Sequence, residues 1–133
     1  MYSNQGGRSI RITGIGLILF AVVLLTAAQL IIKTRLNEHG PIPLAGVDLL
    51  HYLTIVILDV RLVGGFAMLA VAALGWYAGI SRVPLSVAFP AAALAYPLIF
   101  VGAIVFLRED FSWLRLAGNI LIVGGILLAT SDQ

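Results

Sequence analysis

A chain of 133 residues that is 61% hydrophobic and only 11% charged cannot bury its apolar surface within a soluble fold of one domain. A formal net charge of +2, scattered along the chain, provides no basic face for nucleic acid, and the absence of cysteine excludes disulfides and thiolate metal sites. We therefore expect an all-α membrane protein that forms a single transmembrane domain over residues 1–133.

The first predicted span follows a polar tail, Met1–Arg11, for which we expect no regular structure. Ile12–Ile32 carries no charge and is long enough to cross a hydrocarbon core of about 30 Å as a helix. Gln29 and Lys33 are four residues apart near its end, so they lie on one helical face. We expect a turn next, over Asn37–Pro43, because a glycine and two prolines interrupt that segment.

A short apolar segment lies between the first and second predicted spans. Leu49–Leu58 is too short to cross the bilayer, so we expect an interfacial or re-entrant helix there. A charged Asp-Val-Arg sequence separates it from the second span, Leu62–Ser81. This span contains Gly75-x-x-x-Gly79, a spacing of glycines that lets two helices approach closely.

The third predicted span, Val83–Leu107, is uncharged and contains Pro90 and Pro97 on nearly the same helical face. Each proline removes a backbone donor, which leaves the carbonyls of Ser86 and Ala93 without their usual partners. In hydrocarbon these groups need a polar partner, so we expect the stripe to face protein or a watery cavity. The stripe is either a kinked packing surface or the wall of a transport path.

The fourth predicted span covers residues 113–131 and has Asn119 as its one strongly polar side chain. Gly118, Gly124 and Gly125 give it a surface suited to close packing, and they are our candidates for a dimer interface. Both termini are then expected on one side of the membrane, whereas the distribution of Lys and Arg does not decide which side. The four predicted spans are 12–32, 62–81, 83–107 and 113–131.

An ordered set of short motifs now points to a family. The motifs are AAQLIIK at 27–33, LDVR at 58–61, GWY at 75–77, PLSVAFP at 84–90, the loop acid Glu109, and GNILIVGGILL at 118–128. The chain resembles the small four-helix branch of the drug/metabolite transporter superfamily, which includes the small multidrug resistance proteins. Within that branch it is most similar to the subunits (ArnE/ArnF type) of the aminoarabinose–phosphoundecaprenol flippase. Those subunits have a similar Gln-x-x-x-Lys in the first helix and a similar P-x-S-x-A-[YF]-P at the start of the third.

The resemblance implies a flippase or flippase subunit in the bacterial inner membrane, with no cofactor, that serves cell-envelope or lipid A modification. Its cargo would be a polyprenyl-phosphate-linked sugar, and its partner a second copy or a similar small subunit. The implied substrate-binding residues are Lys33 and Arg61 for phosphate, Gln29 and Asn119 for sugar hydroxyls, and Asp59, Glu109 or Asp110 for an amino group. Ser86, whose hydroxyl belongs to the stripe of the third span, is also a candidate for substrate binding. Pro90 and Pro97 would shape the pathway.

Several of these residues also have structural interpretations that the sequence leaves open. Lys33 is equally suited to anchor a helix end at the lipid surface. We favour Asp59 as the N-cap of the following helix over Asp59 as a sugar contact. Glu109 is also placed to balance Arg108 and Arg115 at the membrane surface.

Two other functions are considered. A small multidrug resistance-type exporter needs a buried carboxylate midway along the first helix, and Leu25 occupies the corresponding position. A non-transporting assembly partner is compatible with the glycine-rich second and fourth spans. The chain shows no nucleophile–base pair, phosphate loop or metal cluster, so an enzyme is not expected.

Overall fold

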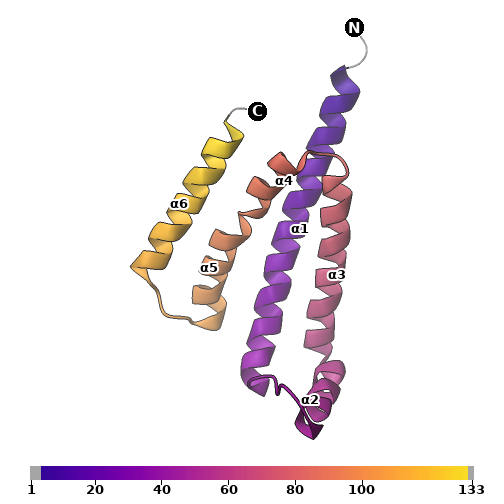
Figure 1. Cartoon of the computed structure of the whole chain (residues 1–133), viewed down its shortest axis with the longest axis vertical. Coiled ribbons are helices and arrows are strands. Elements are labelled where there is room, and N and C mark those ends of the chain that lie inside the picture. The colour runs from indigo at the N-terminus through magenta and orange to yellow at the C-terminus, as the bar shows by residue number, and fades with distance from the viewer. Residues whose placement is uncertain (1–3, 132–133) are drawn as a thin grey trace.

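The computed structural model describes residues 4–131, which form six helices joined by short connections (Figure 1). The helices are α1 (Asn4–His39), α2 (Val47–Leu58), α3 (Val60–Ile80), α4 (Leu85–Ala92), α5 (Ala95–Leu107) and α6 (Trp113–Thr130). Within the described residues, four segments are long and apolar enough to cross a membrane: Gly7–His39, Val60–Ile80, Leu85–Leu107 and Trp113–Thr130. The expectation of an all-α protein with four spans and one shorter helix is therefore confirmed.

The α1 helix is longer at both ends than the predicted first span. Its 36 residues make about 54 Å of helix, well beyond the thickness of a hydrocarbon core. The expected unstructured tail is wrong from Asn4 onward, and the expected turn begins only at Gly40, which has a positive φ of 84°. Residues 37–39, which we expected to belong to the turn, are the last residues of α1. Lys33 therefore lies within the helix and not at its end.

Close packing of α1 against antiparallel α3 forms the centre of the fold (Figure 1). Ile18 of α1 is fully buried, and Gly79 of α3 is buried beside it. A β-carbon at Gly79 would lie 2.5 Å from Ile18 Cγ1 and 3.1 Å from the carbonyl oxygen of Gly14. Only glycine allows this backbone approach, as the Gly75-x-x-x-Gly79 spacing predicts.

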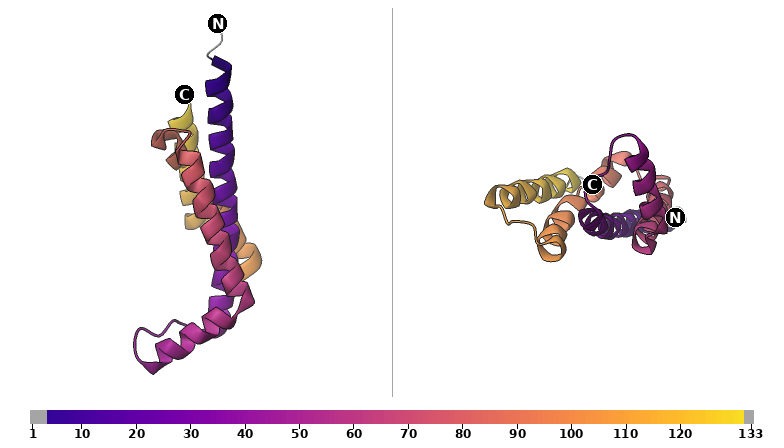
Figure 2. Two further views of the ribbon diagram at one scale, coloured as in Figure 1. Left: turned by 90° about the vertical axis from the view of Figure 1, so that its right-hand side faces the viewer. Right: turned by 90° about the horizontal axis from the view of Figure 1, so that it is seen from below.

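The α2 helix turns away from the axis of α3 at the lower end of the molecule (Figure 2). Its buried Tyr52 donates a hydrogen bond of 3.1 Å to the carbonyl of Gly40, which ties α2 to the end of α1. The helix is apolar but too short to span a bilayer, as expected for an interfacial element.

The third span is broken between the two prolines into α4 and α5, with a turn at Ala93–Leu94 (Figure 1). The ring of Pro97 would clash with the carbonyl of Ala93 in a continuous helix, so the helix stops and restarts with Pro97 in its first turn. The Ala93 carbonyl lacks its usual donor four residues on, as expected, because that residue is Pro97; the N–H of Tyr96 donates to it instead, at 3.1 Å. The turn therefore gives the Ala93 carbonyl a hydrogen-bond donor in place of the one that Pro97 lacks.

The α6 helix forms a hairpin with α5 on the outer side of the bundle, and none of its residues 113–130 is buried. The end of α6 and the beginning of α1 lie at the same end of the molecule, as expected (Figure 1). A β-carbon at Gly118, Gly124 or Gly125 would meet open space within this chain. These three glycines therefore serve no close helix contact in the single chain, and their role in a dimer stays a prediction.

We expect Gly79→Ala to loosen the α1–α3 pair and to lower the free energy of unfolding by about 2 kcal/mol, since the added methyl group would lie 2.5 Å from Cγ1 of the fully buried Ile18, with backbone atoms of Gly14 and Ile18 at 3.1 and 3.2 Å. Thermal or SDS unfolding of the purified protein measures the effect. Gly64→Ala, on the same helix with nothing within 4 Å of the added carbon, is the matched control. Equal stability of the two variants would contradict the assigned packing.

Candidate functional site

Two cationic side chains from separate elements lie at the end of the bundle where α1 ends and α3 begins. Lys33 lies in the last turns of α1, and Arg61 lies in the first turn of α3. Both side chains are exposed, and neither makes a hydrogen bond or ion pair with any residue in 4–131. Lys33 lines a pocket of about 410 Å³ with the chain that follows α1, including Gly40 and Ile42. Two uncompensated positive charges are thus available at one end of the protein.

Asp59 precedes α3 at the same end of the bundle, and both of its carboxylate oxygens are engaged within the chain. Its Oδ1 accepts backbone hydrogen bonds from Arg61 at 2.9 Å and Leu62 at 3.2 Å, which confirms its prediction as the N-cap of α3. Its Oδ2 accepts from Arg35 Nε at 2.9 Å and Arg35 Nη2 at 2.7 Å. His39 Nε2 lies 3.0 Å from the same oxygen and donates to it, because an ionised carboxylate only accepts.

This cluster neutralises the Asp59 carboxylate and fastens α1 to the α2–α3 junction. Hydrogen bonds from His39 and then from Arg35 hold the pKa of the Asp59 carboxyl far below its ordinary value. Sequence reasoning missed Arg35 and His39, which lie twenty or more residues from Asp59 in the chain. A signal was nevertheless present, because one turn of helix separates the two residues and places them on one face.

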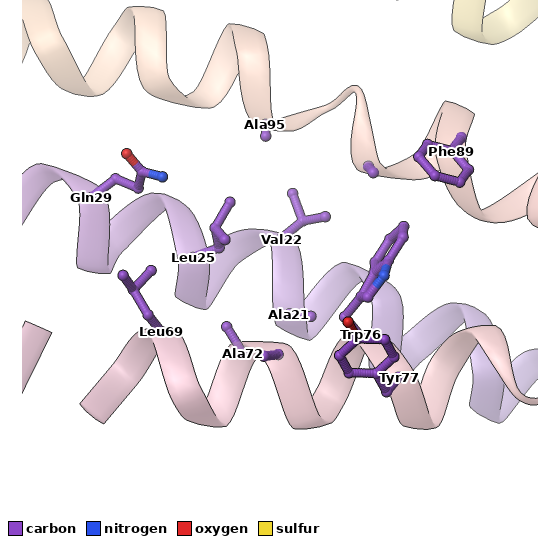
Figure 3. Close-up of a pocket in the computed structure, with 12 residues that line it drawn as sticks. Ala21, Val22, Leu25, Gln29, Leu69, Ala72, Trp76, Tyr77, Phe89 and Ala95 are labelled. Atoms are coloured by element: carbon purple, nitrogen blue, oxygen red, sulfur yellow. The ribbon is translucent and has the colours of Figure 1, made fainter. Parts of the chain in front are cut away.

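An apolar cavity of about 500 Å³ lies between α1, α3 and the α4–α5 break (Figure 3). Its lining is Ala21, Val22, Leu25, Gln29, Leu69, Ala72, Ala73, Trp76, Tyr77, Phe89, Ala92 and Ala95. Trp76 and Phe89 meet edge to face, with ring centroids 5.7 Å apart, and close one end of it. Gln29 projects into the other end (Figure 3). Among the lining residues none is ionisable near neutral pH, and Leu25 lies in the wall.

A smaller pocket of about 310 Å³ lies between α5 and α6 and contains two other predicted site residues, Glu109 and Asn119. Glu109 and Arg115 form an exposed ion pair with a separation of 4.0 Å, which is worth little energy. Ser86, in contrast, is exposed in the first turn of α4, toward the opposite end of the molecule from Lys33 and Arg61 (Figure 1). It lines neither of these pockets.

The predicted site residues therefore fall into separate regions of one chain. Lys33, Asp59 and Arg61 lie at the same end of the bundle, with Lys33 lining a pocket that contains neither of the other two. Gln29 faces the apolar cavity, and Glu109 and Asn119 line the outer pocket. Pro90 lies within α4 and Pro97 in the first turn of α5, on either side of the break above that cavity. The arrangement suits an amphipathic ligand that has a charged end and an apolar end better than it suits a compact soluble one.

These features define a small multi-pass membrane protein with an apolar lateral cavity and an uncompensated cationic end. The chain is similar over most of its length to three proteins named "probable 4-amino-4-deoxy-L-arabinose-phosphoundecaprenol flippase subunit ArnF". The one from Erwinia tasmaniensis is 34% identical, with 81% of this chain and 87% of the relative covered. That from Sodalis glossinidius is 33% identical (86% and 88% covered), and that from Shewanella sediminis is 29% identical (94% and 97% covered). The chain belongs to this family of ArnF subunits.

No protein-family model matches the chain, and no solved structure matches it.

We expect Asp59→Asn to weaken the junction without removing the helix cap, because asparagine caps helices as well as aspartate does but carries no charge for Arg35 and His39. Asp59→Ala loses both the helix cap and the charge, and it should be the less stable variant.

The folded-state pKa of Asp59 is lowered, so the stabilisation that its carboxylate provides is present above its ordinary pKa and is lost as the pH falls below that value. Thermal unfolding of the wild type between about pH 3 and pH 7 should therefore show a loss at the acid end that Asp59→Asn lacks. Parallel pH profiles would refute the assigned ion pairs.

Proposed function

We propose that this chain is one subunit of a flippase that moves a polyprenyl-phosphate-linked sugar, such as aminoarabinose-phosphoundecaprenol, across the bacterial inner membrane. The observation that carries the proposal is membership of the ArnF family, together with the two uncompensated cations at one end of the bundle. On this proposal the protein is a transporter rather than an enzyme, and it serves cell-envelope or lipid A modification.

The cationic end supports a role in binding the phosphate of such a lipid. The phosphodiester of the cargo carries a permanent negative charge, which must leave water for the membrane during flipping. Arg61 can bind two phosphate oxygens at once, and Lys33 supplies a mobile point charge. Neither side chain is neutralised within residues 4–131, whereas Arg35 is already engaged by Asp59 and Glu38. Lys33 and Arg61 are therefore the best phosphate ligands of this end.

The apolar cavity supports a path that is continuous with lipid. A polyprenyl chain stays in hydrocarbon while its headgroup crosses, so the protein needs an opening that is apolar and faces sideways. The cavity between α1, α3 and the α4–α5 break is lined mainly by apolar side chains. Gln29 offers a hydrogen-bonding group in this cavity, one helical turn before Lys33 in α1. A proton-coupled exporter of cations is less well supported, because that cavity has Leu25 in its wall and no carboxylate to hold a cation.

A second subunit completes the proposed transporter. Four spans of this size enclose little volume, and α6 has no buried residue of its own. Gly118, Gly124 and Gly125 on α6 would let another helix approach closely. The relatives are named as flippase subunits, which favours a partner chain, either a similar small subunit or a second copy of this chain.

Lys33→Ala and Arg61→Ala should leave membrane insertion and thermal stability unchanged and reduce translocation of a fluorescent lipid-linked aminoarabinose at least tenfold. Proteoliposomes containing the chain with its partner subunit provide the measurement. Arg82→Ala is the matched control, because Arg82 is an exposed cation at the opposite end of α3. Wild-type rates in both test variants would remove the phosphate assignment.

Replacing both prolines tests the proposed role of the break. Pro90→Ala with Pro97→Ala allows a continuous third helix, since both backbone donors return and the clash with the Ala93 carbonyl disappears. We expect a protein of equal or greater stability with slower flipping, because a straight helix closes the side of the apolar cavity. Normal flipping by a folded double variant would show that the break serves packing alone.

A further inference from the structure

Three polar side chains follow one face of α1 from the apolar cavity to the end of the helix. Gln29, Lys33 and Asn37 are spaced by four residues, so they form one stripe that rises about 12 Å along the helix axis. Gln29 lines the apolar cavity (Figure 3), whereas Lys33 and Asn37 both line the pocket of about 410 Å³ at the end of α1. The stripe therefore leads from an apolar environment to a polar one.

Asn37 is the member of this stripe whose side chain lies farthest from the cavity, and the fold does not use it. The side chain is exposed and makes no hydrogen bond with any residue in 4–131. The next two residues differ from it, because Glu38 pairs with Arg35 and His39 pairs with Asp59. The donors and the acceptor of the Asn37 amide are thus open to a ligand in the pocket.

The chain that leaves α1 at Gly40 forms the other side of the pocket. Gly40 takes a positive φ of 84°, and the hydroxyl of the buried Tyr52 donates to its carbonyl, so this side is held in place by α2. Leu36, Pro41 and Ile42 add apolar surface to the lining. A cation, an amide and a few apolar side chains suit a ligand with an anionic group beside a ring that has hydroxyl edges and apolar faces.

The depth of the pocket matches the headgroup layer of a bilayer. The uncharged run of α1 ends at Ile32, and Asn37 lies five residues, or about 8 Å, beyond it. Lys33 is then at the edge of the hydrocarbon, where the phosphate of a membrane lipid lies, and Asn37 is about 6 Å farther out. The apolar cavity, Lys33 and Asn37 thus follow the order of a lipid tail, its phosphate and the group that the phosphate carries.

We propose that the pocket at the end of α1 binds a phosphodiester that carries a hydroxyl-rich group, with the phosphate on Lys33 and the hydroxyls on Asn37. It rests on the proposed function, because it makes Asn37 the residue that selects the sugar of the lipid-linked cargo. Lys33 contacts the part that all such lipids share, so selectivity for what the phosphate carries falls to Asn37. Gln29, which the family resemblance implies for sugar hydroxyls, lies on the tail side of the phosphate while the headgroup occupies this pocket. Phosphatidylglycerol offers the same chemistry, a phosphodiester with free hydroxyls, from the bilayer itself.

Lipid binding to the purified full-length chain, measured by native mass spectrometry, tests the assignment. The probes are aminoarabinose-phosphoundecaprenol and undecaprenyl methyl phosphate, which keeps the tail and the charged phosphodiester but lacks the sugar. We expect the wild type to bind the sugar-bearing lipid at least fivefold more tightly than the methyl diester. Asn37→Leu and Asn37→Ala should both abolish this preference, while binding of the methyl diester stays unchanged in both.

His51→Leu is the matched control, since it replaces an exposed polar side chain of α2 that does not line the pocket. It should keep the wild-type preference. Equal loss in His51→Leu would reduce the effect to a general change of this surface and overturn the proposal. Loss in Asn37→Leu with an unaltered preference in Asn37→Ala would overturn it as well, because the larger side chain would then have blocked the pocket without any role for the amide.

Phosphatidylglycerol and phosphatidylmethanol distinguish the source of the hydroxyl groups. Preference for phosphatidylglycerol over phosphatidylmethanol that depends on Asn37 assigns the pocket to a bilayer lipid, and its absence together with the sugar preference assigns it to the lipid-linked sugar. Failure of the proposed function has a different signature, in which neither polyprenyl lipid binds more tightly than phosphatidylglycerol. Equal binding of the two polyprenyl lipids to the wild type, without any Asn37-dependent preference for phosphatidylglycerol, would leave the flippase proposal standing and would overturn the role of Asn37.

Discussion

Close packing between α1 and α3 is the contact on which the rest of the structure depends. Gly79 and Ile18 bring the two backbones together at one end, and Gly65 lies against Ile32 at the other. Hydrocarbon gives little driving force for helix association, so a membrane protein relies on such van der Waals contact over a long interface. The pair forms two walls of the apolar cavity, and it carries Lys33 and Arg61 to the same end.

The second hairpin is attached more loosely. Gly102 of α5 packs against Leu30 of α1, whereas α6 contributes no buried residue. The tight turn at Ala93–Leu94 lets α5 leave the direction of α4 and opens the space that becomes the cavity (Figure 1). The chain thus combines a closely packed pair of helices with a broken hairpin whose last helix, α6, buries no residue within the single chain.

Polar groups within this chain divide between those that fold it and those that remain available. Asp59 has both carboxylate oxygens engaged, by the N-terminus of α3 and by Arg35 and His39, so the charge at the junction is already neutralised. Lys33, Arg61 and the free oxygen of Asn119 have no such partners in residues 4–131. Lys33 and Arg61 are exposed, so their charges, unlike that of Asp59, remain available to an anionic group outside the chain.

The sequence alone determined the membrane class, the four spans, the short second helix and the cap at Asp59, because hydropathy, length and the residue at a helix start are local properties. Motif order also led to the correct family. Only the tertiary structure decided that the third span breaks at Ala93–Leu94, that α1 continues to His39, and that Arg35 and His39 hold Asp59. It also separated Gln29, Lys33 and Asn119 into different pockets. These outcomes depend on which helices pack together and how closely, and no pattern within one segment contains that information.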